Sequence, residues 1–202
     1  MLPGRILPRN FYARSTVQVA RDLLGKVLVH GPTAGIIVET EAYLGGEDLA
    51  AHSARGLTGR TRVIFGPPGH AYVYFIYGMY ECLNLVAERD GQPGCVLVRA
   101  LEPLAGVELM RARRGGTARG ITPKVEQLAN GPGKLTLALG ITRAQNGVDV
   151  TRGALVVREA AGAGEMEIEV TQRIGITQSA ELPLRFVIAG NRFVSGGRKV
   201  SR

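Results

Sequence analysis

Residues 71–88 read AYVYFIYGMYECLNLVAE, and this stretch decides the fold. Aromatic and β-branched residues dominate both of its halves, which predicts two strands. Tyr77-Gly78-Met79 lies between the halves and predicts the turn, because glycine lets the chain reverse there. Four of the six tyrosines of a chain without tryptophan fall in this stretch. It is either an ordinary core hairpin or a set of aromatic surfaces for a ligand.

Alternation along the first predicted strand separates its side chains into two sets. Tyr72, Tyr74 and Ile76 share one face. Val73 and Phe75 point the other way, and we expect both in the core.

Further strands are predicted on both sides of this hairpin. KVLVH (26–30) and IIVETEAYL (36–44) flank the turn GPTAG (31–35), which predicts a second hairpin. The remaining predicted strands are CVLVRAL (95–101), ALVVRE (154–159), MEIEV (166–170) and LRFVIA (184–189).

STVQVARDLL (15–24) predicts a helix that Ser15 caps and Gly25 stops. Other helices are predicted from Pro103 to Arg113, after Thr122-Pro123, and over GPGKLTLALGI (131–141). Strands in meanders, with helices between them in no strict βαβ order, predict a single α+β domain over residues 1–202.

The chain is strongly basic, with a net charge of +8 and an isoelectric point near 10. Only Lys26, Lys124, Lys134 and Lys199 are lysines, so arginine supplies most of the 25 basic residues. Guanidinium groups bind phosphate in a bidentate manner, which favours a nucleic-acid partner over a merely solvated surface.

Cys82 and Cys95 form neither a disulfide framework nor a C-x-x-C metal pair. No apolar run is long enough for a signal peptide or a membrane span. We therefore expect a cytoplasmic protein without a membrane partner.

Alternation along residues 36–44 places Glu39, Glu41 and Tyr43 beside Ile37 on one side of the strand. The opposite side is the predicted core face, made of Ile36, Val38, Thr40, Ala42 and Leu44. The two carboxylates either belong to a solvated edge strand or line a site.

His52 favours the second interpretation, because the segment from 45 to 70 is too long for a simple connector. A carboxylate, a tyrosine and a histidine together are typical of a general-base pocket. Glu39, Glu41, Asp48 and His52 could also be metal ligands, but their spacing matches no metal motif, and no metal site is predicted.

Three basic residues could serve this pocket or bind DNA. A buried Arg99 would need a carboxylate partner, for which Glu41 is a candidate. GPGK (131–134) is not a nucleotide-hydrolysing P-loop, because Leu135 stands where serine or threonine is required. Lys134 at this helix start and Arg60 in the long loop are candidate phosphate contacts.

ETEAYLGGEDLAAHS (39–53) and FGPPGHAYVYFIYGMYECLN (65–84) resemble the 3-methyladenine DNA glycosylases of the alkyladenine type. The resemblance runs over nearly the whole chain. Further matching blocks are ARDLLGK (20–26), CVLVRALEPLAGVELM (95–110), GPGKL (131–135) and PLRF (183–186). The chain departs from the family pattern at Thr58-Gly59-Arg60-Thr61.

The resemblance implies an enzyme that removes damaged purines from double-stranded DNA, as a monomer and without metal or cofactor. It implies a curved, largely antiparallel sheet with flanking helices and a protruding hairpin that enters the minor groove. The expected substrates are 3-methyladenine, 7-methylguanine, hypoxanthine and ethenoadenine.

The resemblance also assigns roles to residues. It makes Glu41 the base that activates water and Arg99 the group that helps hold this water. The flipped base stacks between Tyr43 and Tyr74, next to His52. The remaining roles fall to Asn84, which rejects normal purines, and to Tyr77, which fills the space the nucleotide leaves.

Tyr72 and Tyr80 are interpreted as structural. The matching pocket blocks contain no lysine, so water rather than a Schiff base is the expected nucleophile, and no lyase activity is expected. Two other classes remain open: a non-catalytic nucleic-acid-binding module, and a metal-dependent nuclease that uses Glu39, Glu41 and Asp48.

Overall fold

The computed structural model describes residues 4–76, 78–115, 123–160, 164 and 166–196. The strands are β1 (Val27–His30), β2 (Thr33–Tyr43), β3 (Ala71–Ile76), β4 (Tyr80–Val86), β5 (Cys95–Ala105), β6 (Leu155–Arg158), β7 (Ile168–Thr171) and β8 (Arg185–Ile188). The α-helices are α1 (Arg9–Tyr12), α2 (Thr16–Asp22), α3 (Val107–Arg114) and α4 (Pro132–Leu139). Short 3₁₀ helices are η1 (His52–Arg55), η2 (Val125–Gln127) and η3 (Arg143–Gln145).

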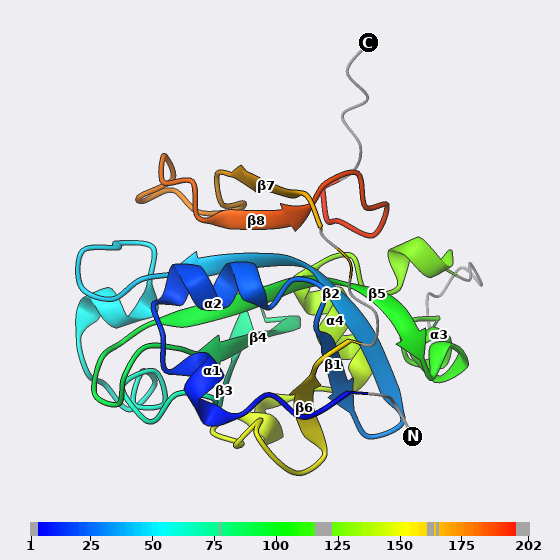
Figure 1. The fold of residues 1–202 in the computed structure, drawn as a ribbon, viewed down its shortest axis with the longest axis horizontal. Coiled ribbons are helices and arrows are strands. Elements are labelled where there is room, and N and C mark those ends of the chain that lie inside the picture. The colour runs from blue at the N-terminus through cyan, green and yellow to red at the C-terminus, as the bar shows by residue number, and fades with distance from the viewer. Residues whose placement is uncertain (1–3, 77, 116–122, 161–163, 165, 197–202) are drawn as a thin grey trace.

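All of the strand pairs are antiparallel, and they form one curled sheet in the order β3-β4-β5-β2-β1-β6 (Figure 1). β2 is the branch point. β5 follows one of its edges, whereas β1 and β8 divide the other edge between them. β7 pairs with β8 next to β2, at the top of Figure 1. The prediction of an α+β fold with a curved antiparallel sheet is confirmed.

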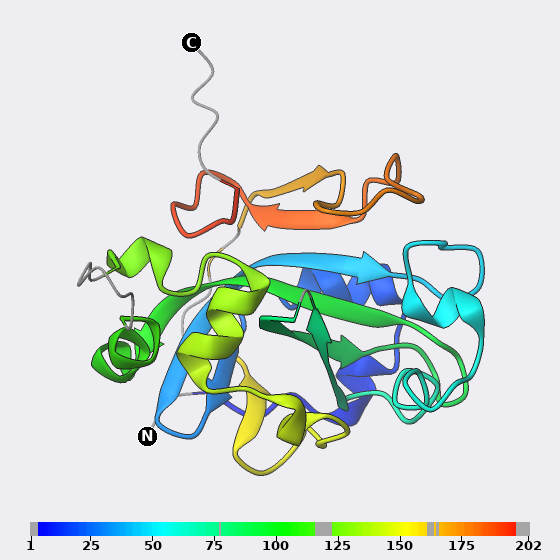
Figure 2. The same cartoon turned by 180° about the vertical axis from the view of Figure 1, so that it is seen from behind.

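The two faces of the central strands have different roles. On one face, Leu83 and Val98 belong to the main core together with residues of α2 and α4. Thr40 Oγ1 donates to the carbonyl of Ala20 in α2 (2.8 Å), which fixes this helix against β2. The other face carries the candidate site residues of β2, β3, β4 and β5. Figure 2 shows α4 from the side opposite to Figure 1.

The predicted first helix is confirmed together with its cap. The backbone N–H of Gln18 donates to Ser15 Oγ (3.4 Å) at the start of α2. Gly25 follows the helix with φ of +77°, the left-handed conformation in which glycine ends helices without strain.

The predicted hairpin at 71–88 forms, but one of its core assignments is wrong. Val73 lies in the core, as expected. Phe75 is 41% exposed and lies under the guanidinium of Arg143, 4.8 Å from the ring centroid. The outer end of β3 therefore extends beyond the core and contacts η3. Tyr77 at the turn lies outside the described residues.

Strict alternation along β2 also fails. Shifts in register with β5 between Ile37 and Thr40 interrupt the pattern as a β-bulge does. Ile37 consequently lies in the main core, while Val38 packs with Phe193 in a separate cluster. The two residues thus exchange their predicted faces. The predicted turn is also shorter, since β2 begins at Thr33.

The helix predicted to open at Pro103 begins four residues later. Pro103 belongs to β5, where it pairs with Gly35, and α3 starts at Val107 after Gly106 with φ of +69°. Proline was a misleading start signal here, because the pairing with β2 keeps the chain extended to Ala105. The described helices include none that is long and apolar enough to cross a bilayer.

Candidate active site

The two carboxylates of β2 face Arg99 of the neighbouring strand β5. Arg99 Nε donates to Glu39 Oε1 (3.0 Å), and Arg99 NH1 lies 3.3 Å from Glu41 Oε1. Glu39 and Glu41 are both fully buried. The solvated-edge interpretation of this strand is therefore wrong, and the pairing of Arg99 with Glu41 is confirmed.

Glu41 accepts hydrogen bonds at both carboxylate oxygens. The backbone N–H of Ile174 donates to Oε1 (2.8 Å), and the Tyr43 hydroxyl donates to Oε2 (2.9 Å). Burial raises the pKa of Glu41 above its ordinary value, and the nearby Glu39 adds to this increase. Arg99 and the two hydrogen bonds oppose it by stabilising the ionised form.

Glu39 is held by residues from the end of the chain. Arg185 Nε donates to its Oε1 (2.7 Å), as does Ser195 Oγ (2.9 Å). The backbone N–H of Ser195 donates to Oε2 (2.6 Å). A buried carboxylate is stable when it is paired and its lone pairs are hydrogen-bonded, as they are here. Sequence reasoning missed Arg185 and Ser195, since no local pattern links them to β2.

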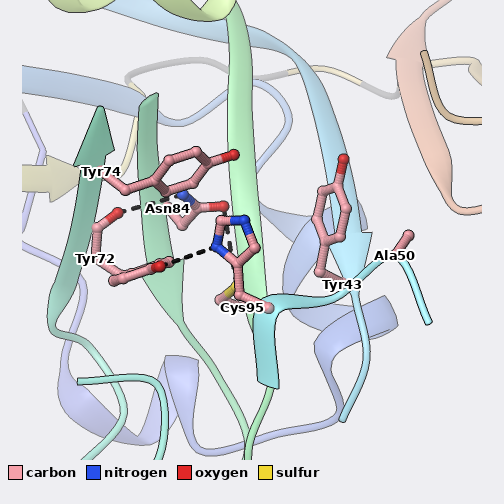
Figure 3. Close-up of a pocket in the computed structure, with 7 residues that line it drawn as sticks. Tyr43, Ala50, Tyr72, Tyr74, Asn84 and Cys95 are labelled. Carbon is pink, nitrogen blue, oxygen red and sulfur yellow. Dashed lines mark hydrogen bonds between the residues drawn. The ribbon is translucent and has the colours of Figure 1, made fainter. Parts of the chain in front are cut away.

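A small aromatic pocket is lined by Tyr43, whose hydroxyl donates to Glu41 (Figure 3 shows the pocket). β2 contributes Tyr43, and β3 contributes Tyr72 and Tyr74. β4 contributes Asn84, whose side-chain amide donates to the carbonyl of Tyr72 (3.2 Å). Cys95 of β5 together with Ala50 and His52 completes the lining, so the tertiary structure gathers side chains from four strands around one cavity.

The pocket has a volume of only about 20 Å³, enough for about one water molecule. It adjoins a groove of about 550 Å³. The rings of His52 and Tyr74 are 4.6 Å apart. The two rings meet edge to face, so His52 packs directly against one of the two tyrosines proposed to stack the base.

His52 is neutral in this environment. Burial, with a smaller contribution from the guanidinium groups of Arg60 and Arg55, lowers the pKa of His52 to about 4. Arg60 NH2 lies 3.5 Å from Nε2 and can only donate, so the ring proton belongs on Nδ1. Nδ1 is 2.9 Å from the Tyr72 hydroxyl. Tyr72, which was interpreted as merely structural, lines the pocket and orients His52.

Asp48 is a buried ion-pair partner. Its two oxygens accept hydrogen bonds from Arg173 NH1 (2.6 Å) and NH2 (2.8 Å). The guanidinium of Arg173 also lies 4.7 Å from the centroid of the Tyr43 ring. Sequence reasoning missed Arg173. Among the described residues, no group of three or more histidine, cysteine, aspartate or glutamate side chains could hold a metal ion.

The candidate DNA contacts lie at the edge of this site. Arg60 lies 5.3 Å from the Tyr74 ring centroid. Lys134 lines the groove at the start of α4, where its Nζ donates to Asn130 Oδ1 (2.9 Å). Tyr80, also interpreted as structural, lines the same groove and is 42% exposed. Tyr77, the predicted intercalating residue, lies outside the described residues.

Comparison with known proteins identifies the family of this chain. The sequence profile of the methylpurine-DNA glycosylase family matches residues 10–192. A relative in Methanoculleus marisnigri, described as a "Putative 3-methyladenine DNA glycosylase", is 55% identical over 94% of this chain and 98% of its own length. Relatives of the same description in Koribacter versatilis and Methanocella arvoryzae are 51% and 52% identical, over 95% and 89% of this chain and 94% and 89% of their own lengths. The chain therefore belongs to the methylpurine-DNA glycosylase family.

Proposed function

We propose that this protein is a DNA-3-methyladenine glycosylase that hydrolyses the bond between a damaged purine and deoxyribose and so initiates base excision repair. The observation that carries the proposal is Glu41, a fully buried carboxylate held by Arg99 and Tyr43 beside a tyrosine-lined pocket. The names of the relatives support the choice of substrate.

The glycosidic bond is hidden within a duplex, so the damaged nucleotide must first be flipped out of the stack. Flipping costs a few kcal/mol of stacking and pairing. Stacking against aromatic side chains returns about 1–3 kcal/mol per base. Tyr43 and Tyr74 supply this stacking in the proposal, and Asn84 rejects normal purines. Tyr77 at the hairpin turn takes the place that the nucleotide leaves.

In the chemical step, Glu41 accepts a proton from water as the water oxygen bonds to the anomeric carbon. The glycosidic bond breaks, and its electron pair leaves with the purine. Arg99 keeps Glu41 ionised and helps hold the water. The products are a free base and an abasic strand that remains intact, because water and not an amine is the nucleophile.

The proposed substrates are 3-methyladenine, 7-methylguanine, hypoxanthine and ethenoadenine. The first two carry a positive charge and leave readily. The neutral lesions require more help from the pocket. A DNA substrate is also the reason to place the protein inside the cell.

The test is incubation with a duplex that carries one hypoxanthine, in the presence of EDTA, followed by hot alkali. Strand cleavage that appears only after alkali is the expected result. Cleavage before alkali that EDTA abolishes would identify a nuclease instead. Binding of the duplex without any cleavage would identify a non-catalytic module.

Glu41→Gln connects this activity to the site. The variant should lose at least 100-fold in the rate of base release, the order of magnitude that general acid–base catalysis contributes. It should still bind the lesion duplex, because glutamine fills the same space. Undiminished base release by the variant would exclude Glu41 as the base.

A further inference from the structure

A buried arginine lies against Tyr43 but has no part in the reaction proposed above. The side chain of Arg173 is 0% exposed, and its guanidinium is 4.7 Å from the centroid of the Tyr43 ring. Tyr43 lines both the pocket and the groove, whereas Arg173 is absent from the described lining of either cavity. The guanidinium therefore lies behind the ring, on the side away from an incoming base.

Asp48 and two carbonyls hold Arg173 in this position. Besides the two bonds to Asp48, Arg173 NH1 donates to the carbonyl of Ala42 (3.0 Å), and NH2 donates to the carbonyl of Ser179 (3.1 Å). Burial by itself would lower the pKa of Arg173, but Asp48 raises it, so the group stays charged. The cation behind Tyr43 is thus permanent and fixed in orientation.

A cation on one face of an aromatic ring changes what the other face can bind. The negative face of a ring attracts cations because of its quadrupole. Arg173 already uses this attraction from behind. A cationic base on the pocket side would meet a polarised ring and the repulsion of a second positive charge. A neutral base would not be repelled.

A guanidinium group also lies near the ring of Tyr74, the second tyrosine proposed to stack the base. The guanidinium of Arg60 lies 5.3 Å from the centroid of the Tyr74 ring and 3.5 Å from His52 Nε2. His52 itself is neutral, so it adds no charge of its own at pH 7. Both tyrosines proposed to stack the base are therefore associated with a guanidinium group.

We propose that Arg173 is a specificity-determining residue that acts through Tyr43. It lowers the preference of the pocket for cationic, ring-alkylated purines and so allows neutral lesions such as hypoxanthine to compete. This inference rests on the proposed glycosylase function. It assigns to Arg173 an effect on the ratio between two substrate classes, which a purely structural clamp would not have.

The experiment measures kcat/KM under single-turnover conditions on two duplexes of equal sequence, one with 7-methylguanine and one with hypoxanthine. The test variant is Arg173→Met combined with Asp48→Asn, which removes both buried charges together. We expect the ratio of 7-methylguanine to hypoxanthine excision to rise about threefold to tenfold, in line with the strength of cation–π interactions.

Two further variants separate charge from packing. Arg173→Lys keeps the positive charge near Tyr43, so its excision ratio should stay closer to that of the parent than the ratio of the double variant. Arg173→Gln removes the charge but can still donate a hydrogen bond to Asp48, and it should raise the ratio too. Because it leaves Asp48 charged, it should raise the ratio at least as much as the double variant does, and it provides a second test if the double variant does not fold.

Arg14→Gln is the matched control. Arg14 also lies over an aromatic ring, that of Phe11 (4.6 Å), and pairs with an aspartate, Asp22 (2.7 Å), but near α1 and α2. The variant removes one positive charge, as Arg173→Gln does, and should leave the ratio unchanged.

The outcomes distinguish the inference from the proposed function. An unchanged ratio in folded variants without the Arg173 charge, or an equal change in Arg14→Gln, would overturn the role of Arg173. Failure of the parent protein to release either base would instead overturn the proposed glycosylase activity.

Discussion

Glu39 shows how a residue outside the reaction can control one within it. Its Oε1 accepts a hydrogen bond from Arg99 Nε, and NH1 of the same guanidinium faces Glu41. Its charge also raises the pKa of Glu41. Glu39 is therefore a positioning residue that influences both the orientation of Arg99 and the protonation of the proposed base.

Glu39→Gln should lower the pKa that governs the acid side of the pH–rate profile, because the negative charge of Glu39 raises the pKa of Glu41 and the variant lacks this charge. It should also slow base release about tenfold or more, since Arg99 loses a charged partner. The measurement is kcat/KM for hypoxanthine excision between pH 4 and pH 8. If the variant is slower but the acid side of its pH–rate profile does not shift, Glu39 has only a structural role.

Glu41→Gln should make the protein more stable relative to the parent as pH rises. The folded-state pKa of Glu41 is raised, so the unfolded chain releases the proton first and stability falls with rising pH above the unfolded value of about 4.3. Glutamine does not titrate, and its amide can donate to the Tyr43 hydroxyl. Thermal unfolding at pH 4 and pH 7 measures the difference, each kcal/mol corresponding to about 2–4 °C. If the gain in stability of Glu41→Gln over the parent is larger at pH 4 than at pH 7, the prediction is contradicted.

At the scale of elements, β2 organises the site. It contributes Glu39, Glu41 and Tyr43 and pairs with three other strands. Near its start, at Gly35, the backbone of β2 lies very close to β5. A Cβ at Gly35 would lie 2.9 Å from the carbonyl oxygen of Glu102 and 2.9 Å from Leu101 Cβ. The β2–β5 ladder, on which Arg99 meets both carboxylates, therefore requires glycine at this position.

Gly35→Ala should lower the free energy of unfolding by about 1–3 kcal/mol, the range for forcing extra atoms into a packed region. Gly59→Ala is the control, because a Cβ there meets no atom within 4 Å and its φ is not in the left-handed region. Urea denaturation of both variants gives the comparison. Equal stability of the two would show that β2 can shift away from β5 at no cost.

At the scale of the whole molecule, the end of the chain completes a site that begins at residue 39. The family match ends at residue 192. Ser195 nevertheless donates from both its backbone N–H and its hydroxyl to Glu39. The site is thus formed by segments that are 156 residues apart in sequence.

A chain truncated after Val194 should lose about 3–6 kcal/mol of stability and most of its activity. It leaves Glu39 buried without two of its donors, each of which is worth about 1.5–3 kcal/mol to a charged acceptor. A chain truncated after Gly196 keeps Ser195 and is the control. Thermal unfolding and hypoxanthine release measure the effect. Parent-like behaviour of the shorter chain would show that Ser195 is dispensable.

The sequence by itself determined the α+β class, the hairpins and the capped helix α2, because these depend on local propensity and spacing. Its motif blocks also identified the family, and this resemblance assigned Tyr43, His52, Tyr74 and Asn84 to one pocket, which all four line in the structure. Only the tertiary structure decided the bulge in β2, the exposure of Phe75, and the groups around Glu39 and Tyr43. Arg173 and Ser195 reach the site through contacts more than 100 residues apart in sequence. Such contacts arise from burial and charge pairing in the folded chain, and no local pattern in the sequence encodes them.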